Sequence, residues 1–172
     1  MSDLPADRPA DLPRGVTLRD AIPGDEGLVD HFVRQLAIYE KMEHLAEGTP
    51  EMFAQALFST PPRVWAMIVQ HEGTPIGLAL YYFNFSTFMA RPGLYLEDIF
   101  VDPAHRGRGI GKAIFRVLAR RALEQGCARM EWSVLDWNAP SIAFYRSLGA
   151  VGMEDWTVQR LQGETLARVA GL

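Results

Sequence analysis

Apolar residues recur along the chain with two different periods, which predict a mixture of helices and strands. Spacings of three and four residues between Leu28 and Ala37 predict a helix with one buried face. Short apolar runs bounded by glycine, proline or acidic residues predict strands. We expect helices over residues 23–37, 49–57, 110–126 and 138–148, and strands over residues 16–20, 63–71, 74–85, 94–101, 129–135 and 156–161.

The order of these elements predicts the fold class. A turn at Glu72-Gly73 joins two strands as a hairpin, whereas helices separate other strands, so both hairpin and crossover connections are present. The economical architecture is a mixed sheet flanked by helices, an α/β (α+β) fold. Residues 1–15 combine prolines with charged residues and predict a disordered arm, and residues 88–93 predict a loop. We therefore expect one domain over residues 16–172.

The composition and net charge of the chain limit the kinds of molecule that it is expected to bind. The chain has 172 residues, 48% apolar and 22% charged, which suits one hydrophobic core. A net charge of -4 argues against nucleic-acid binding and suits a small cationic substrate. No apolar run approaches the length of a bilayer-spanning helix, and a single cysteine cannot form an internal disulfide. We expect a cytoplasmic protein without a membrane partner, in which Cys127 is a packed residue rather than a nucleophile.

A basic, glycine-rich stretch between the strand at 94–101 and the following helix indicates an anion site. Residues without side chains let backbone N–H groups approach an anion, and a helix N-terminus adds free donors and a favourable dipole. A solvated glycine turn is the plain alternative, and neither a P-loop nor a dinucleotide-binding pattern matches. A diphosphate fits the whole stretch, which reads His105-Arg106-Gly107-Arg108-Gly109-Ile110-Gly111-Lys112.

Two adjacent acids interrupt an otherwise apolar strand. Glu97 and Asp98 must point to opposite faces of the sheet unless a bulge intervenes, so at least one of them should be partly desolvated. Desolvation raises the pKa of a carboxyl group toward the range useful to a general base. The alternative is a pair of acids satisfied by neighbouring arginines or backbone groups, and the strand pattern alone does not decide between the two.

A third segment combines a polar helix cap with an aromatic pair. Asn138 and Ser141 suit helix capping or a ligand amide, and the spacing of Phe144 and Tyr145 favours core packing. A suitably placed tyrosine is also a reasonable general acid for a leaving thiolate.

Together these segments resemble the Gcn5-related N-acetyltransferase superfamily. Its acetyl-coenzyme A signature matches Arg106, Gly109 and Gly111, and its later pattern matches Asn138, Ser141, Phe144 and Tyr145. A narrower resemblance is to the diamine acetyltransferases, which include the spermidine/spermine and thialysine enzymes. It rests on residues 36–40, 81–83, 95–98 and 137–141.

The resemblance implies a strongly bent, mixed, mostly antiparallel sheet, a homodimer, and acetyl-coenzyme A as cosubstrate without a metal. It implies that Glu97 binds or deprotonates the amine and that Tyr145 protonates the departing coenzyme A. The backbone of Ile99, Phe100 and Val101 would pair with pantetheine, residues 107–112 would hold the pyrophosphate, and Asn138 and Ser141 would contact the coenzyme further along. The implied substrate-side positions are Tyr39, Glu40, Ser86, Glu97, Glu131 and Glu154.

One departure bears on the substrate. The polyamine enzymes carry an acid shortly after the Tyr-Tyr-Phe segment, where this chain reads Asn84-Phe85-Ser86-Thr87, and Glu131 offers a carboxylate on the neighbouring strand instead. We therefore expect acetyl transfer to a primary amine of a diamine, a polyamine or a lysine-like amino acid. A protein acetyltransferase acting on lysine or an N-terminus and a non-catalytic acyl-coenzyme A-binding module are the alternatives.

Overall fold

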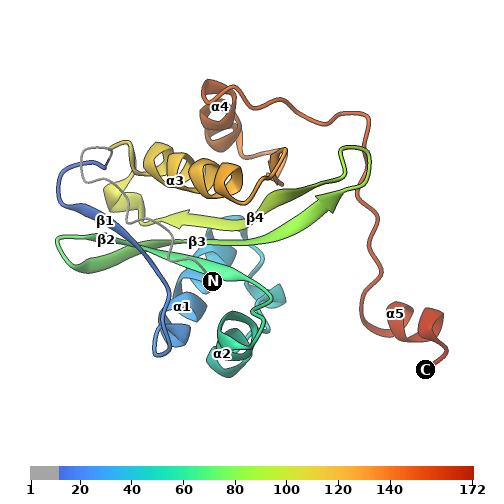
Figure 1. The fold of residues 1–172 in the computed structure, drawn as a ribbon. Coiled ribbons are helices and arrows are strands. Elements are labelled where there is room, and N and C mark those ends of the chain that lie inside the picture. The colour runs from blue at the N-terminus through green and yellow to red at the C-terminus, as the bar shows by residue number, and fades with distance from the viewer. Residues whose placement is uncertain (1–11) are drawn as a thin grey trace. The chain divides into compact units, whose positions relative to one another are not determined.

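The computed structural model (Figure 1) describes residues 12–172. These residues form two compact units that divide after Ser133. Most of the expected arm at residues 1–15 lies outside the described residues. The first unit contains the sheet and the helices packed on it, and the second unit, Val134–Leu172, contains α4 and α5. The expectation of one domain over residues 16–172 stays a prediction.

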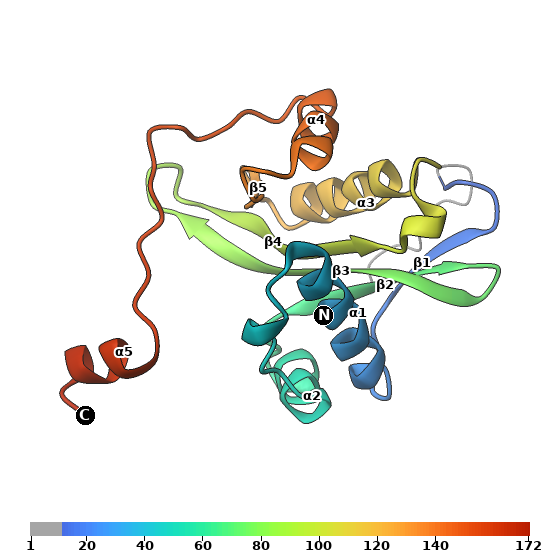
Figure 2. The ribbon, with the colours of Figure 1, turned by 180° about the vertical axis from the view of Figure 1, so that it is seen from behind.

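The first unit is built on a five-stranded sheet in the order β1-β2-β3-β4-β5. Neighbouring strands are antiparallel from β1 to β4, and β5 runs parallel to β4, beside which it lies in Figure 2. The chain returns to that parallel position through α3, as a crossover connection requires. This confirms the mixed, mostly antiparallel sheet. Its strands are β1 (Val16–Asp20), β2 (Trp65–His71), β3 (Thr74–Ser86), β4 (Arg91–Val101) and β5 (Met130–Trp132).

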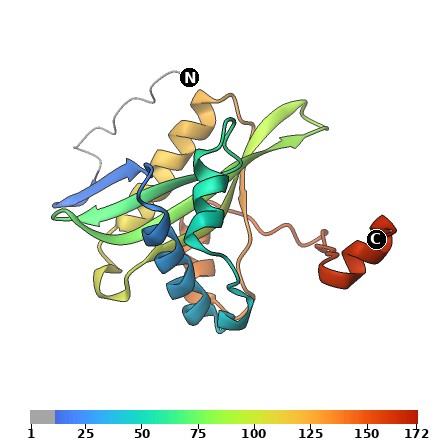
Figure 3. The same ribbon diagram turned by 90° about the horizontal axis from the view of Figure 1, so that it is seen from below.

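Helices cover both faces of this sheet, as Figures 1 and 3 show. On one face, α1 buries Val29 and Phe32 against a core that includes Leu80 of β3. On the other face, α3 buries Ile114 and Leu118. The apolar spacing between Leu28 and Ala37 therefore predicted the buried stripe of α1 correctly. The helices of this unit are α1 (Glu26–Glu40), the short 3₁₀ turn η2 (Glu43–Leu45), α2 (Pro50–Phe58), η3 (Pro103–His105) and α3 (Ile110–Glu124).

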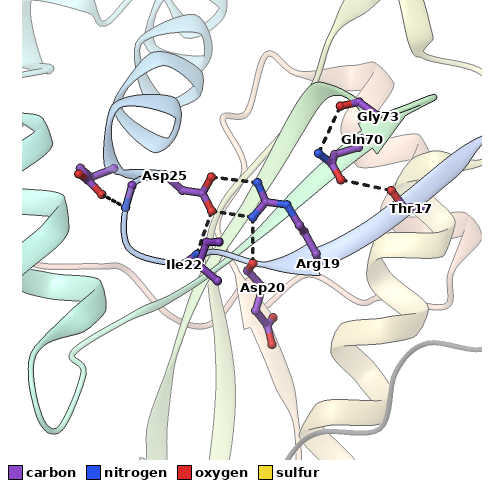
Figure 4. Close-up of polar contacts among 9 residues, drawn as sticks. Thr17, Arg19, Asp20, Ile22, Asp25, Gln70 and Gly73 are labelled. Carbon is purple, nitrogen blue, oxygen red and sulfur yellow. Dashed lines mark hydrogen bonds and ion pairs between the residues drawn. The ribbon is translucent and has the colours of Figure 1, made fainter.

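The turn from β1 into α1 is fixed by one carboxylate (Figure 4). Asp25 accepts hydrogen bonds from both terminal nitrogens of Arg19, at 2.6 and 2.9 Å, and from the backbone N–H of Ile22 at 2.9 Å. The bond from Arg19 is the main reason that the pKa of Asp25 lies below its usual value. These bonds join the end of β1 to the start of α1.

Two sequence predictions at the C-terminal end are wrong. The expected strand over residues 156–161 has no regular structure, and Trp156 and Val158 are exposed. A strand needs a partner for its backbone groups, and no strand of the described residues pairs with this segment. The chain then forms a helix that was not predicted, α5 (Gly163–Ala170), after α4 (Ala139–Ser147) in the same unit.

Smaller differences affect the strand ends. The expected strand over residues 129–135 is reduced to β5, and the expected loop over residues 88–93 ends earlier, because Arg91, Pro92 and Gly93 already pair with β3. Within residues 12–172, no helix has both the length and the apolar character needed to cross a membrane. The expected cytoplasmic location stays a prediction.

Candidate active site

A bulge in β4 brings the two adjacent acids to the same face of the sheet. Leu80 of β3 pairs with Asp98 and the next residue, Tyr81, pairs with Leu96, so Glu97 is an extra residue on β4. A bulge of this kind interrupts the alternation of side chains between the two faces. The strand pattern assigned opposite faces to Glu97 and Asp98 only for a strand without a bulge.

The register identifies which face the acids share. Leu80 belongs to the core beneath α1, so its partner Asp98 faces α1. Tyr82 lies two residues after Leu80 and pairs with Tyr95, and Glu97 follows Tyr95 by two residues, so these side chains face α1 as well. In contrast, Tyr81 faces α3, where its hydroxyl accepts a hydrogen bond from Arg121 at 2.8 Å.

Asp98 is the desolvated member of the pair. Burial, followed by the negative charges of Glu97 and Glu40, raises the pKa of Asp98 to about 6. Burial also raises the pKa of Glu40, at the C-terminal end of α1. Glu97 itself is exposed. The expectation that at least one acid is desolvated is confirmed, and a carboxyl group with a pKa near neutrality can accept a proton from a bound amine.

A pair of tyrosines continues this face. The rings of Tyr82 and Tyr95 stack with their centroids 5.1 Å apart, and Tyr95 Oη lies 2.8 Å from Ser133 Oγ in a hydrogen bond. Burial raises the pKa of Tyr82, and the charges of Glu97 and Glu131 add to the effect. Tyr82 therefore lies within the fields of both carboxylates. We call this surface the acidic face; its carboxylates are Glu40, Glu97, Asp98 and Glu131.

At the far end of the acidic face, Glu131 has partners of its own. Glu131 pairs with Tyr95 across the parallel strands β4 and β5, so its side chain lies on the acidic face. Glu131 Oε2 accepts a hydrogen bond from Asn84 Nδ2 at 3.1 Å and lies 2.9 Å from Arg129 Nε in an ion pair. Glu131, which the sequence predicts to replace the acid missing after the Tyr-Tyr-Phe segment, is thus paired with a cation.

The glycine-rich loop has the geometry of an anion site. Gly107 and Gly109 have positive φ angles of 74° and 80°, which favour glycine, and no atom lies within 4 Å of a Cβ added at Gly107. Gly109 is the N-cap of α3 and supplies no side-chain cap, so the first N–H groups of that helix have no side-chain acceptor there. Ile110 and Gly111 form the first turn of α3. These features fit a diphosphate at the helix N-terminus.

The two arginines of the loop, Arg106 and Arg108, have different contacts. Arg106 Nε donates to the Val101 carbonyl at 2.8 Å, and its guanidinium lies 4.8 Å from the ring centroid of Tyr39. Arg106 therefore connects the loop to the end of α1, next to Glu40. Arg108 donates to the Ala104 carbonyl at 3.2 Å.

The edge of β4 beyond the bulge has no strand beside it among the described residues. Contacts with β5 involve residues 94–96 of β4, whereas the segment that includes Ile99, Phe100 and Val101 pairs with β3 on its other side. An extended ligand can hydrogen-bond to such an edge as an added strand does. This arrangement fits the pantetheine pairing that the resemblance implies.

The remaining predicted residues lie at the β3–β4 turn or in the other unit. Ser86 is buried, and its hydroxyl accepts a hydrogen bond from Met89 N at 3.4 Å in the β3–β4 turn. In the second unit, Asn138 caps α4 by accepting a bond from Ser141 N at 3.3 Å. The rings of Phe144 and Tyr145 lie 5.4 Å apart, and Glu154 is exposed.

Sequence reasoning missed Arg129 and gave Asp98 no role of its own. Asp98 was visible as an acid in an apolar strand, but the bulge that turns it toward α1 leaves no mark in the residue pattern. Arg129 precedes Glu131 by two residues, the spacing of side chains on one face of a strand, and this signal could have found the pair. No group of three or more histidine, cysteine or acidic side chains in residues 12–172 is arranged to hold a metal ion.

The chain is similar to known proteins along most of its length. Residues 29–150 match the model of the acetyltransferase (GNAT) family. A thialysine N-epsilon-acetyltransferase from Bos taurus is 35% identical over 167 residues, which cover 91% of this chain and 98% of that protein. An L-ornithine N5-acetyltransferase from Arabidopsis thaliana is 26% identical, covering 88% of this chain and 86% of that one. An integron cassette protein from V. cholerae has a structure with a TM-score of 0.75 at 25% identity, covering 91% and 98%.

Proposed function

Because the chain belongs to the acetyltransferase (GNAT) family, we propose that it transfers an acetyl group from acetyl-coenzyme A to a primary amine of a small cationic substrate. The family membership confirms the resemblance drawn from the sequence. The observation that carries the choice of substrate is the acidic face, which joins the glycine-rich loop through the contact of Arg106 with Tyr39. A cation that binds to this face lies in the same unit as the loop expected to hold the coenzyme.

The proposed reaction is a direct attack without a covalent enzyme intermediate. An alkyl amine with a pKa of about 10.4 arrives as an ammonium ion and must lose a proton before it can react. Glu97 attracts the ammonium and accepts that proton, directly or through water. The nitrogen lone pair then attacks the thioester carbonyl, the C–S bond breaks, and Tyr145 donates its proton to the thiolate. Backbone N–H groups near Ile99 stabilise the oxyanion.

Asp98 contributes a second carboxylate to the proton transfer. Its pKa of about 6 makes it a stronger base than an ordinary aspartate while leaving it ionised at neutral pH. Asp98 is next to Glu97 on the same face, so it can receive the proton that Glu97 or a bound water takes from the ammonium. The proposal therefore assigns the deprotonation to the Glu97–Asp98 pair.

Acetyl-coenzyme A is proposed to bind along β4 and the loop that follows it. The backbone N–H groups of residues 107–112 and the charges of Arg108 and Lys112 suit the pyrophosphate, and the open edge at Ile99–Val101 suits the pantetheine amides. Asn138 and Ser141 are proposed contacts in the second unit. Holding both reactants together would supply much of the rate acceleration.

A panel of acceptors tests the proposed function. Thiol release from acetyl-coenzyme A would be measured with diamines, polyamines, lysine analogues and peptides, and the products identified by mass spectrometry. Rapid release with small amines supports the proposal. Release with peptides alone would favour a protein acetyltransferase, and tight coenzyme binding with no release for any amine would favour a binding module.

A single substitution tests the proposed acid. Tyr145→Phe removes the phenol proton, so turnover should fall by about 100-fold or more while acetyl-coenzyme A affinity stays nearly unchanged. Calorimetry with the coenzyme provides the control for binding. Wild-type turnover in this variant would remove Tyr145 from the mechanism.

A homodimer is part of the proposal. Apolar side chains in the C-terminal unit are exposed, and an extended run of such side chains is typical of a surface that meets another chain. Light scattering coupled to gel filtration would report a dimer mass if the proposal holds and a monomer mass if it does not. The exposed side chains are Val151, Met153, Trp156, Val158 and Leu161.

A further inference from the structure

The ion pair at the far end of the acidic face has the charges that recognise an amino acid. We propose that Arg129 and Glu131 bind the α-carboxylate and the α-ammonium of a free amino acid whose terminal amine is acetylated. This inference rests on the proposed function and specifies its substrate class. A diamine or a polyamine presents no carboxylate, so Arg129 would distinguish the two classes of substrate.

The pair is exposed enough to meet a ligand. The side chains of Arg129 and Glu131 are 37% and 32% exposed. Arg129 contacts Glu131 through Nε, the nitrogen nearest the side-chain stem, and the two terminal nitrogens of a guanidinium form the fork that binds carboxylates. The two charges lie side by side, as the α-ammonium and α-carboxylate of an amino acid do.

The surroundings hold the pair in position. Gly93 lies opposite Asn84, and a Cβ at Gly93 would collide with Asn84 Oδ1 and come within 3.2 Å of Arg129 Cγ. The missing side chain thus makes room for both Asn84 and Arg129. Asn84 Oδ1 is buried, has no hydrogen-bond partner among the described residues, and belongs to the amide whose Nδ2 donates to Glu131.

The spacing along the sheet matches a lysine-like side chain. Glu131 pairs with Tyr95, and Glu97 is two residues further along β4, so the two acids are about 8 Å apart at the backbone, from strand rise and strand spacing. In an extended lysine, the two nitrogens are about 7 Å apart, from ordinary bond lengths. Tyr95 lies beside Glu131 and two residues before Glu97, and its ring stacks on Tyr82, so the two rings offer an apolar surface next to both acids for the methylene chain.

Matched acceptors test the inference on the wild-type protein. Lysine, lysinamide and 1,5-diaminopentane share the terminal amine and the second ammonium, and only lysine carries the carboxylate. We expect kcat/KM for lysine to exceed that for the other two by about 10-fold or more, mainly through KM, since a charge-assisted hydrogen bond is lost without the carboxylate. Equal use of lysine and lysinamide would overturn the inference.

Two variants separate recognition from a structural role. Arg129→Gln should lower kcat/KM for lysine to the level of lysinamide and leave 1,5-diaminopentane unchanged, whereas Arg129→Lys should retain part of the preference. Glu131→Gln should raise KM for all three acceptors, because each carries the second ammonium. Arg63→Gln, the same charge change at an exposed position before β2, is the control.

The outcomes also separate this inference from the proposed function. If Arg129→Gln lowers kcat/KM for all three acceptors equally, the pair is only a cross-strand structural contact and the inference is overturned, while acetyl transfer stands. If no amine releases thiol from the wild-type protein, the proposed function fails and the inference fails with it.

Discussion

Asp98 and Glu131 lie on neighbouring strands and share one face of the sheet, yet their carboxyl groups meet opposite surroundings. Asp98 is partly buried beside two further acids, Glu97 and Glu40, and its pKa rises to about 6. Glu131 lies against Arg129 and receives a hydrogen bond from Asn84. One end of the acidic face therefore gathers three acids, whereas the acid at the other end is paired with a cation.

The difference suits the two ends of the acidic face to two different functions, proton acceptance and substrate recognition. An uncompensated, partly buried carboxylate attracts an ammonium strongly and accepts its proton readily, because neutralisation relieves the cost of burial. A carboxylate that is already balanced has less to gain from a proton and suits recognition of a charge that stays in place. In the proposed mechanism, proton transfer therefore takes place at the β4 bulge and substrate selection at β5.

Substitution at the bulge should have the largest effect. Glu97→Gln and Asp98→Asn each remove a proposed proton acceptor and should lower kcat by about 100-fold or more, as expected for general base catalysis. Glu131→Gln should act mainly on KM. Thiol-release kinetics on all three variants measure the contrast, with acetyl-coenzyme A binding by calorimetry as the control. A loss of kcat in Glu131→Gln as large as that in Asp98→Asn would contradict the separate roles proposed for Asp98 and Glu131.

The Asp98→Asn substitution should also stabilise the folded protein at high pH. The pKa of Asp98 is raised in the folded state, so its contribution to stability is present at low pH and is lost as pH rises from about 4 to about 6. At pH 8, Asp98→Asn should therefore raise the free energy of unfolding by about 1–3 kcal/mol, the value that a shift of about two pKa units implies.

Urea unfolding at pH 8 and at pH 4 measures this effect. The gain should largely disappear at pH 4, where the wild-type carboxyl group is protonated. A destabilised Asp98→Asn variant at pH 8 would mean that the native carboxylate has partners that outweigh its burial.

A methyl group at Gly93 should disturb only the end of the acidic face that holds the Arg129–Glu131 ion pair. Gly93→Ala would push Asn84 and Arg129 apart, so KM for lysine should rise by about 5-fold while kcat stays close to wild type, in proportion to a weakened charged contact. Gly27→Ala is the matched control, since a Cβ there meets no atom within 4 Å. Steady-state kinetics compare the two. An unchanged KM in Gly93→Ala would show that the close packing at Gly93 does not support substrate binding.

The sequence predicted most of the fold because most of it depends on local pattern. The stripe that includes Val29 and Phe32 predicted the buried face of α1, and Glu72-Gly73 predicted the hairpin of β2 and β3. The glycine-rich loop was recognised because its glycines lie between a strand and a helix, where bare backbone N–H groups can approach an anion. In the structure, Gly107 and Gly109 adopt positive φ angles that other residues rarely adopt.

The errors have a common physical origin in long-range pairing. The segment from Trp156 to Leu161 has strand-like composition, but composition does not supply the neighbour that a strand requires. The bulge at Glu97 depends on the register of β3 against β4. The hydrogen bond between Asn84 and Glu131 joins residues that are 47 positions apart in the sequence. Single-residue patterns carry no record of such pairings.

The pH dependence of kcat/KM for lysine, compared between the wild-type protein and Asp98→Asn, tests the proton-accepting role of the bulge most directly. The active form carries the ionised carboxylate, so wild-type activity should fall as pH drops through about 6, the pKa of Asp98, and this inflection should be absent from Asp98→Asn and retained in Glu131→Gln. The same inflection in wild type and Asp98→Asn would contradict the account.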